Sequence, residues 1–157
     1  PYSGDQAAVG RFSAQLAQQP PLDTATLRPT EADTLPEAMP AQTLDLRLGG
    51  PIAPYTWVIN DQVYDPEAAG LPVRPAQRTR IRYINDSMMF HPMHLHGHTF
   101  QVQGPDGPRA RKDTVLVPPL ATVVADFDTD NPGKWITHCH NEYHLEAGMA
   151  TYLRYSP

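Results

Sequence analysis

The chain has 157 residues, a formal net charge of −5 and a pI near 5.7. This length suits one core-forming unit, and no apolar run is long enough to cross a bilayer, so we expect no membrane span. The acidic balance, without a basic stripe interleaved with aromatic residues, excludes nucleic acid as a partner. The single cysteine, Cys139, excludes an internal disulfide.

The first 41 residues differ in composition from the rest of the chain. Residues 1–19 are compatible with a short helix, and residues 20–41 carry five prolines among acidic residues and threonines. Such a composition predicts an extended linker lying on a surface. We therefore assign residues 1–41 to a linker or interdomain extension with a short helix. No signal peptide is recognisable at Pro1, and we expect the chain to begin within a longer protein.

Residues 42–157 alternate short strand-like runs with turn signals such as GPDG (104–107) and DNPG (130–133). Short strands joined by Pro/Gly turns predict an all-β fold, a Greek-key sandwich. Trp57 and Trp135 lie in apolar runs, so we expect both to pack in the core or between domains. The predicted strands are 43–48, 55–60, 78–84, 98–103, 113–117, 121–127, 133–139 and 150–155.

All seven histidines and the cysteine fall in two short clusters, HPMHLHGH (91–98) and HCHNEYHLEAGM (138–149). Imidazole and thiolate are donors that suit copper, and a cysteine with two histidines and a weak methionine describes a blue-copper site. The clusters are expected at strand ends and loops, with residues 91–98 leading into the strand 98–103 and Cys139 ending the strand 133–139.

Strand geometry predicts how these side chains are arranged. Successive side chains of a strand point to opposite faces, so Cys139 points one way and its neighbours His138 and His140 point the other. The same alternation puts His94 and His96 on one face. The sequence therefore predicts two metal sites placed back to back, one of them able to hold several copper ions.

The two motifs resemble those of the multicopper oxidases, the laccase-like family, and specifically their C-terminal cupredoxin domain. The match covers about residues 42–157 and implies a cupredoxin β-sandwich. Carried over residue by residue, it implies type 1 copper at His91, Cys139 and His144 with axial Met149. It further implies type 2 copper at His94 and type 3 copper at His96, His138 and His140. His98 is left without a metal role and is expected to be a hydrogen-bonded structural residue.

The resemblance also implies a function. Type 1 copper would take electrons from a small reducing substrate, such as a phenol, an aromatic amine or a low-valent metal ion. Cys139 would pass them through His138 and His140 to a cluster that reduces dioxygen to water. The family completes this cluster with four further histidines from another domain, and this sequence has none. Other cupredoxin domains of the same enzyme, or a second copy of the chain, are therefore expected partners. The chain alone is expected to be an incomplete oxidase, and the resemblance implies an extracytoplasmic or secreted location.

Two other functions stay open: a stand-alone blue-copper electron carrier and a copper-binding module without turnover. A pure carrier needs no imidazoles on the far side of its cysteine, which favours the oxidase. Zinc is a less favoured metal, because it does not require one thiolate between two opposed imidazoles.

The remaining candidates are assigned structural roles. Met88, Met89 and Met93 are expected to pack in the core rather than to bind copper. Asp113, Glu142 and Glu146 are expected to be surface carboxylates rather than groups that orient an electron donor.

Overall fold

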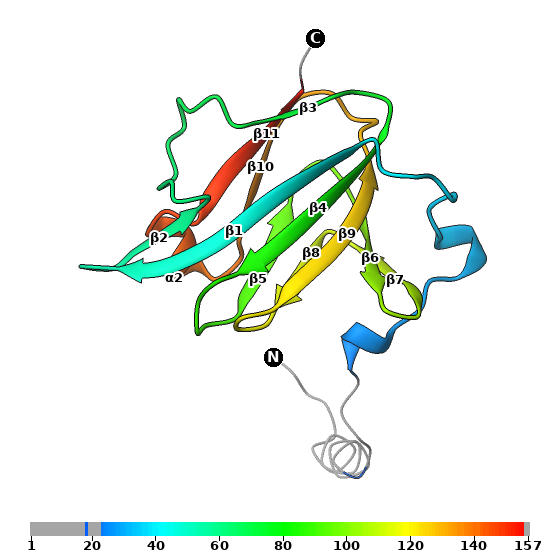
Figure 1. Ribbon diagram of the computed structural model, residues 1–157, viewed down its shortest axis with the longest axis horizontal. Coiled ribbons are helices and arrows are strands. Elements are labelled where there is room, and N and C mark those ends of the chain that lie inside the picture. Colours follow the sequence, from blue (N-terminus) through cyan, green and yellow to red (C-terminus); the bar gives the residue numbers. More distant parts are fainter. Residues whose placement is uncertain (1–17, 19–22, 156–157) are drawn as a thin grey trace, which may run out of the picture.

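The computed structural model describes residue 18 and residues 23–155, and its strands form two packed sheets (Figure 1). The six-stranded sheet has the order β2 (Thr56–Ile59), β1 (Gln42–Ile52), β4 (Arg78–Asn85), β9 (Thr122–Asp128), β6 (Phe100–Gly104) and β7 (Gly107–Lys112). The five-stranded sheet has the order β3 (Leu71–Val73), β11 (Ala150–Tyr155), β10 (Lys134–Cys139), β5 (His91–Leu95) and β8 (Thr114–Val117).

Neighbouring strands are often distant in sequence, since the chain crosses repeatedly from one sheet to the other. This is a Greek-key arrangement, and the predicted all-β sandwich is confirmed. The helix predicted within residues 1–19 lies outside the described residues. Within residues 23–155, no helix combines the length and the apolar character needed to cross a membrane.

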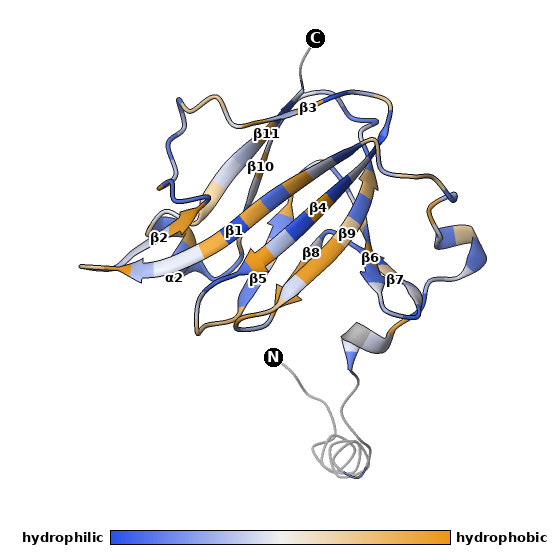
Figure 2. Cartoon of the chain, viewed as in Figure 1, coloured by the Kyte–Doolittle hydropathy of each residue, from blue (hydrophilic) through white to orange (hydrophobic). Residues whose placement is uncertain are grey.

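The core lies between the two sheets and follows the alternation of the strands. Along β1, the three leucines of the run 43–48 are buried while the residues between them are exposed, and Figure 2 shows the same alternation in colour. Buried apolar residues from every other strand except β7 complete this core. Trp57 is part of it and Trp135 is partly buried. The two sheets thereby form a rigid support for the loops at their ends.

The segment before β1 lies across the outer face of the six-stranded sheet. It contains two 3-10 turns, η1 (Thr24–Thr26) and η2 (Glu31–Asp33). Leu35 is buried, its amide donates to Oε1 of Gln101 at 3.0 Å, and Arg78 donates to the carbonyl of Pro36 at 2.9 Å. In Figure 1 this blue segment passes beside β6 and β7.

The first histidine cluster is placed differently from the prediction. Residues 91–95 form a separate strand, β5, in the five-stranded sheet, and the chain crosses to the other sheet before β6 begins at Phe100. Gly97 makes this corner possible, because its φ is +71° and an added Cβ would lie 2.4 Å from the ring of Trp135. The cluster does precede the strand β6, but the sequence did not predict that residues 91–95 form a strand of their own. Strands β3 and β7 and the helix α2 (Glu142–Glu146) were also not predicted.

The methionine prediction is correct for one residue of three. Met93 points into the core, but Met88 and Met89 are exposed. The loop between β4 and β5 is held through its backbone, since the side-chain amide of Asn85 donates to the carbonyl of Met89 at 2.7 Å. A loop fixed by its carbonyl groups does not need its side chains in the core, so Met88 and Met89 project outward.

Arginines on the outer face of β4 pair with carboxylates on the neighbouring strands. Arg80 donates from Nε and Nη2 to the two carboxylate oxygens of Asp126 at 2.8 and 2.9 Å, and the Asp126 side chain is only 6% exposed. Two residues further on, Arg82 pairs with Asp45, but both side chains are well exposed. Of these two pairs, one is therefore largely buried and the other solvated, and a third pair, Arg78 with Asp128, lies at the start of the strand.

We predict that Arg80→Ala lowers the free energy of unfolding by about 2 kcal/mol, because it leaves the buried Asp126 carboxylate unpaired. Arg82→Ala is the matched control on the same face of the same strand, and its effect should be much smaller, since water solvates Asp45. Urea unfolding followed by circular dichroism measures both. Equal losses in the two variants would contradict a special role for the buried pair.

Candidate metal centre

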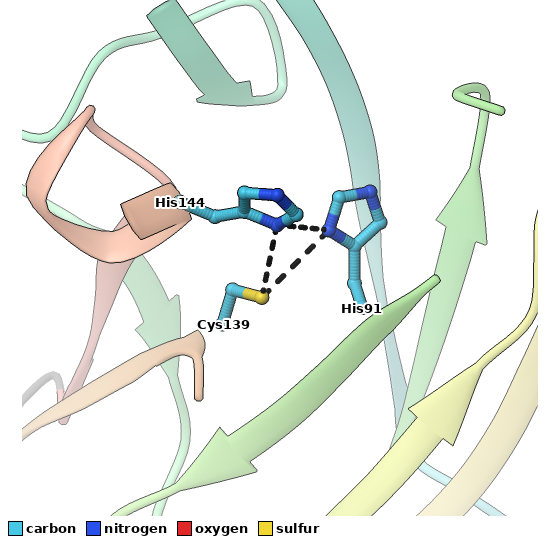
Figure 3. Close-up of side chains that lie close together, drawn as sticks. All are labelled: His91, Cys139 and His144. Carbon is cyan, nitrogen blue, oxygen red and sulfur yellow. Dashed lines mark hydrogen bonds between the residues drawn. The ribbon is translucent and has the colours of Figure 1, made fainter. Parts of the chain in front are cut away.

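Three side chains from three elements meet at one end of the sandwich (Figure 3). His91 begins β5, Cys139 ends β10, and His144 lies on α2. The Nδ1 atoms of the two histidines are 3.1 Å apart, and Sγ of Cys139 lies 3.7 Å from Nδ1 of His91 and 3.6 Å from Nδ1 of His144. All three side chains are fully buried. We call this set the thiolate group.

Local structure accounts for the convergence. Strands β5 and β10 are antiparallel neighbours, with Cys139 opposite Met93. After β10, Asn141 caps α2 by accepting a hydrogen bond from the amide of Tyr143 at 3.2 Å. This short helix turns the chain back, so that His144 faces the end of the strand that it has just left.

The donor set fits a single transition-metal ion. Metal bonds to imidazole nitrogen and thiolate sulfur are about 2.0–2.3 Å long, so two donors of one ion lie about 3–4 Å apart. The three separations within the thiolate group fall in this range. Nε2 of His91 lies 2.7 Å from Oγ of Ser87. A proton on Nε2 that is donated to Ser87 leaves the Nδ1 lone pair facing the centre, as a metal ligand requires.

Burial keeps the thiolate group uncharged in the absence of a metal. Desolvation lowers the pKa of His91 to about 4, with a smaller contribution from the nearby His144, and it also lowers the pKa of His144. Desolvation raises the pKa of the Cys139 thiol to about 11. At neutral pH both imidazoles are therefore ready to bind a metal, whereas the thiol must first lose its proton.

Met149 lies directly beside this group. Its amide donates to the carbonyl of His144 at 2.9 Å, its carbonyl accepts from the amide of Cys139 at 3.1 Å, and its side chain is fully buried. The backbone thus ties Met149 to two members of the thiolate group.

A second set of imidazoles lies on the opposite face of the five-stranded sheet. Candidate ligand atoms of His94, His96 and His138 all lie within 4.8 Å of one another, and we call these residues the imidazole group. Nε2 of His96 is 3.1 Å from Nε2 of His138, and Nδ1 of His94 donates to the carbonyl of Asp113 at 2.8 Å. The His140 ring lies 5.8 Å from the rings of both His94 and His138, at the edge of the group.

The two groups meet at Cys139. Its side chain points into the core, while His138 and His140 point to the other face, and His140 is exposed. His138 pairs with His94 across the two strands. Burial and the neighbouring imidazoles lower the pKa of His96, and burial also lowers that of His138. Three imidazoles whose candidate ligand atoms lie within 4.8 Å of one another can hold at least one metal ion.

The other candidates lie outside both groups. His98 donates to the carbonyl of His96 at 3.2 Å, and its Nε2 lies 2.7 Å from the hydroxyl of Tyr155, so it is a hydrogen-bonded residue. Asp113, Glu142 and Glu146 are exposed.

Sequence reasoning missed Ser87 and Trp57 as neighbours of the thiolate group. The Trp57 ring contacts both of its imidazoles. No motif marks these two residues: Ser87 lies four residues before His91 in the loop between β4 and β5, and Trp57 reaches the site only through the tertiary fold.

Comparisons with known proteins agree on one family. A family model described as multicopper oxidase matches residues 36–157. The multicopper oxidase MmcO of Mycobacterium tuberculosis is 50% identical over 117 residues, which cover 74% of this chain and 23% of that protein. Copper resistance protein A of Pseudomonas syringae pv. tomato is 36% identical over 116 residues, which cover 73% of this chain and 19% of that protein. The chain thus spans about a fifth to a quarter of the length of these relatives.

A solved structure supports the fold. Fet3p, described as a multicopper oxidase that functions in iron import, superposes with a TM-score of 0.74 at 23% identity. The match covers 87% of this chain and 35% of that chain. The two-sheet sandwich is therefore that of a multicopper oxidase cupredoxin domain.

The protonation states lead to a prediction. Since the pKa of Cys139 is about 11, a metal ion must displace the thiol proton at pH 7, whereas His91, with a pKa of about 4, has none to lose. Co(II) binding should release about one proton more in the wild-type chain than in Cys139→Ser. Affinity in the wild type should tighten about tenfold for each pH unit between 6 and 8. Calorimetric titration in buffers of different ionisation enthalpy measures the release, and equal values in the two proteins would contradict the assignment.

Proposed function

Because the chain belongs to the multicopper oxidase family and carries its C-terminal cupredoxin domain, we propose that the thiolate group binds the type 1 copper of such an oxidase. His91, Cys139 and His144 would be the strong ligands and Met149 the weak axial ligand. The observation that best supports this proposal is that the buried sulfur of Cys139 and one nitrogen of each imidazole lie 3.1–3.7 Å apart. Two imidazoles and one thiolate with a long methionine contact form a blue-copper site.

The imidazole group would hold part of a trinuclear copper cluster. In this proposal His94 binds type 2 copper, and His96, His138 and His140 bind type 3 copper. Four imidazoles on one face leave each copper short of ligands, and the other three histidines of this sequence are His91 and His144 in the thiolate group and His98, which is hydrogen-bonded to Tyr155. Another cupredoxin domain, in the same polypeptide or on another chain, would supply the rest.

Copper, when bound, would supply one-electron redox chemistry. The protein would position the copper ligands and exclude water from them. The side chains of the thiolate group are fully buried, and Ser87 orients the His91 ring. Cys139 is joined through the backbone to His138 and His140, so a short covalent path links the two faces of the sheet. Electrons taken from a small reducing substrate would follow this path toward a cluster that reduces dioxygen to water. A laccase-like substrate range and an extracytoplasmic location belong to the same proposal.

One observation weighs against the simpler alternatives. A stand-alone electron carrier or a copper-storage module has no use for converging imidazoles behind its cysteine. Here His94, His96 and His138 converge there, within the part of the chain that the structure describes. Both remain alternatives to the oxidase.

We expect the copper-loaded chain to be intensely blue, because a buried Cys139 thiolate bound to Cu(II) absorbs visible light strongly. Cys139→Ser should abolish the band, and Glu146→Gln, an exposed position two residues after His144, should keep it. Visible and electron paramagnetic resonance spectra check this. A colourless copper-loaded wild type, or a serine variant that stays blue, would refute the type 1 assignment.

We further expect the isolated monomer to accept electrons without reducing dioxygen to water, because half of the cluster's imidazoles are absent from it. Oxygen consumption with a phenolic donor should stay at background for the monomer isolated by size exclusion. Adding cupredoxin domains of a homologous oxidase that lack their own C-terminal domain should restore turnover. Sustained turnover by the monomer alone would contradict the need for a partner domain.

A further inference from the structure

The thiolate group cannot be touched by a donor from solution. His91, Cys139, His144 and Met149 are each fully buried, and Ser87, the partner of His91, is nearly so. Any electron that reaches this site must therefore cross at least one intervening side chain. The question is which side chain links the buried imidazoles to the surface.

Trp57 makes the closest ring contacts with the site. Its ring centroid lies 4.1 Å from that of His144 at an interplanar angle of 31°, and 5.0 Å from that of His91 at 71°. Its amide donates to the carbonyl of Ala147, which ties β2 to the end of α2. The indole N–H is buried without a hydrogen-bond partner among the described residues. Since a buried indole usually finds a partner, packing against the imidazoles rather than a hydrogen bond holds this ring in place.

Tyr55 continues the row of rings to the surface. It contacts Trp57 edge to face, with centroids 6.1 Å apart and an interplanar angle of 84°, and it is 48% exposed. The close approach of β1 to Trp57 depends on Gly50, where a Cβ would lie 2.9 Å from the indole ring. Tyr55, Trp57 and His144 thus form a continuous row of aromatic rings from solvent to the metal site.

We propose that electrons enter the type 1 site through Tyr55 and Trp57, with an aromatic donor stacking against Tyr55. This inference rests on the proposed function. In the transfer, an aromatic diamine loses one electron and becomes its radical cation, one Cu(II) is reduced to Cu(I), and no proton moves. Neither ring is itself oxidised. The packed π-systems shorten the through-space gaps that an electron must tunnel across.

A second way into the site passes through Asn141. Its side-chain amide lies 3.4 Å from Nε2 of His144, at the limit of a hydrogen bond, and the residue is half-buried. An amide offers a donor no stacking surface, and this contact is looser than the tight packing of Trp57 on His144. We therefore favour the aromatic row, and the experiment separates the two routes.

The test follows anaerobic bleaching of the blue band by stopped flow, with tetramethyl-p-phenylenediamine as the donor and the copper-loaded chain as the acceptor. Loss of one aromatic stacking surface should slow Tyr55→Leu about tenfold, while Tyr55→Phe, which keeps the ring, should stay within about twofold of wild type. The control is Tyr143→Leu, which removes a 77% exposed tyrosine on α2 and should leave the rate unchanged. Asn141→Ser keeps a helix cap, removes the amide and should also leave the rate unchanged.

Spectra and reduction potentials of all variants are measured first, so that rates are compared at equal driving force. A Tyr55→Leu rate equal to or above that of wild type overturns the proposal, as does an equal loss in Tyr55→Phe or in Tyr143→Leu. A loss confined to Asn141→Ser moves the route to α2 and also overturns it. If the wild-type chain has no blue band, the proposed function fails and this inference falls with it. A blue wild type with an unaffected Tyr55→Leu refutes the electron route alone.

Discussion

The antiparallel pairing of β5 with β10 is the constraint on which both metal groups depend. It sets Cys139 opposite Met93 and His138 opposite His94. Because side chains alternate along a strand, this register sends one row of donors into the core and the other to the opposite face. A slip of one residue would exchange the faces and destroy both groups together. The hydrogen-bonding register of these two strands therefore fixes the geometry of both metal groups.

Burial keeps the side chains of the thiolate group uncharged, and it also costs free energy because polar groups are removed from water. Two imidazoles and a thiol removed from water are held neutral, which is reflected in a pKa of about 4 for His91 and about 11 for Cys139. Hydrogen bonds to Ser87 and ring contacts with Trp57 orient groups that would otherwise be poorly satisfied. A bound metal would offset this cost directly, so metal binding and the stability of this end of the domain are coupled.

The two faces of the five-stranded sheet have different surroundings. The members of the thiolate group are fully buried, and the aromatic row from Trp57 to Tyr55 and the contact of Asn141 with His144 connect its imidazoles to more exposed residues. The imidazole group is open, because its member His96 is exposed and so is His140 at its edge. One face is thus suited to receiving electrons across a barrier, and the other to meeting a partner that brings further ligands. Cys139, lying between them, belongs to both.

The sequence alone determined the sandwich, its main strands and the division of the donors between two faces, because period-two alternation and donor spacing are local properties. It left unseen the corner at Gly97, the separate strand β5 and the short helix α2, and it placed Met88 and Met89 in the core. Trp57 could not be foreseen as a neighbour of the site, since no local pattern records which distant strands meet, and the contact of Ser87 with His91 depends on the path of the loop between them. Tertiary structure decided these points, because the burial of His91 and His144 and the ring contacts of Trp57 arise only when the two sheets close over the same space.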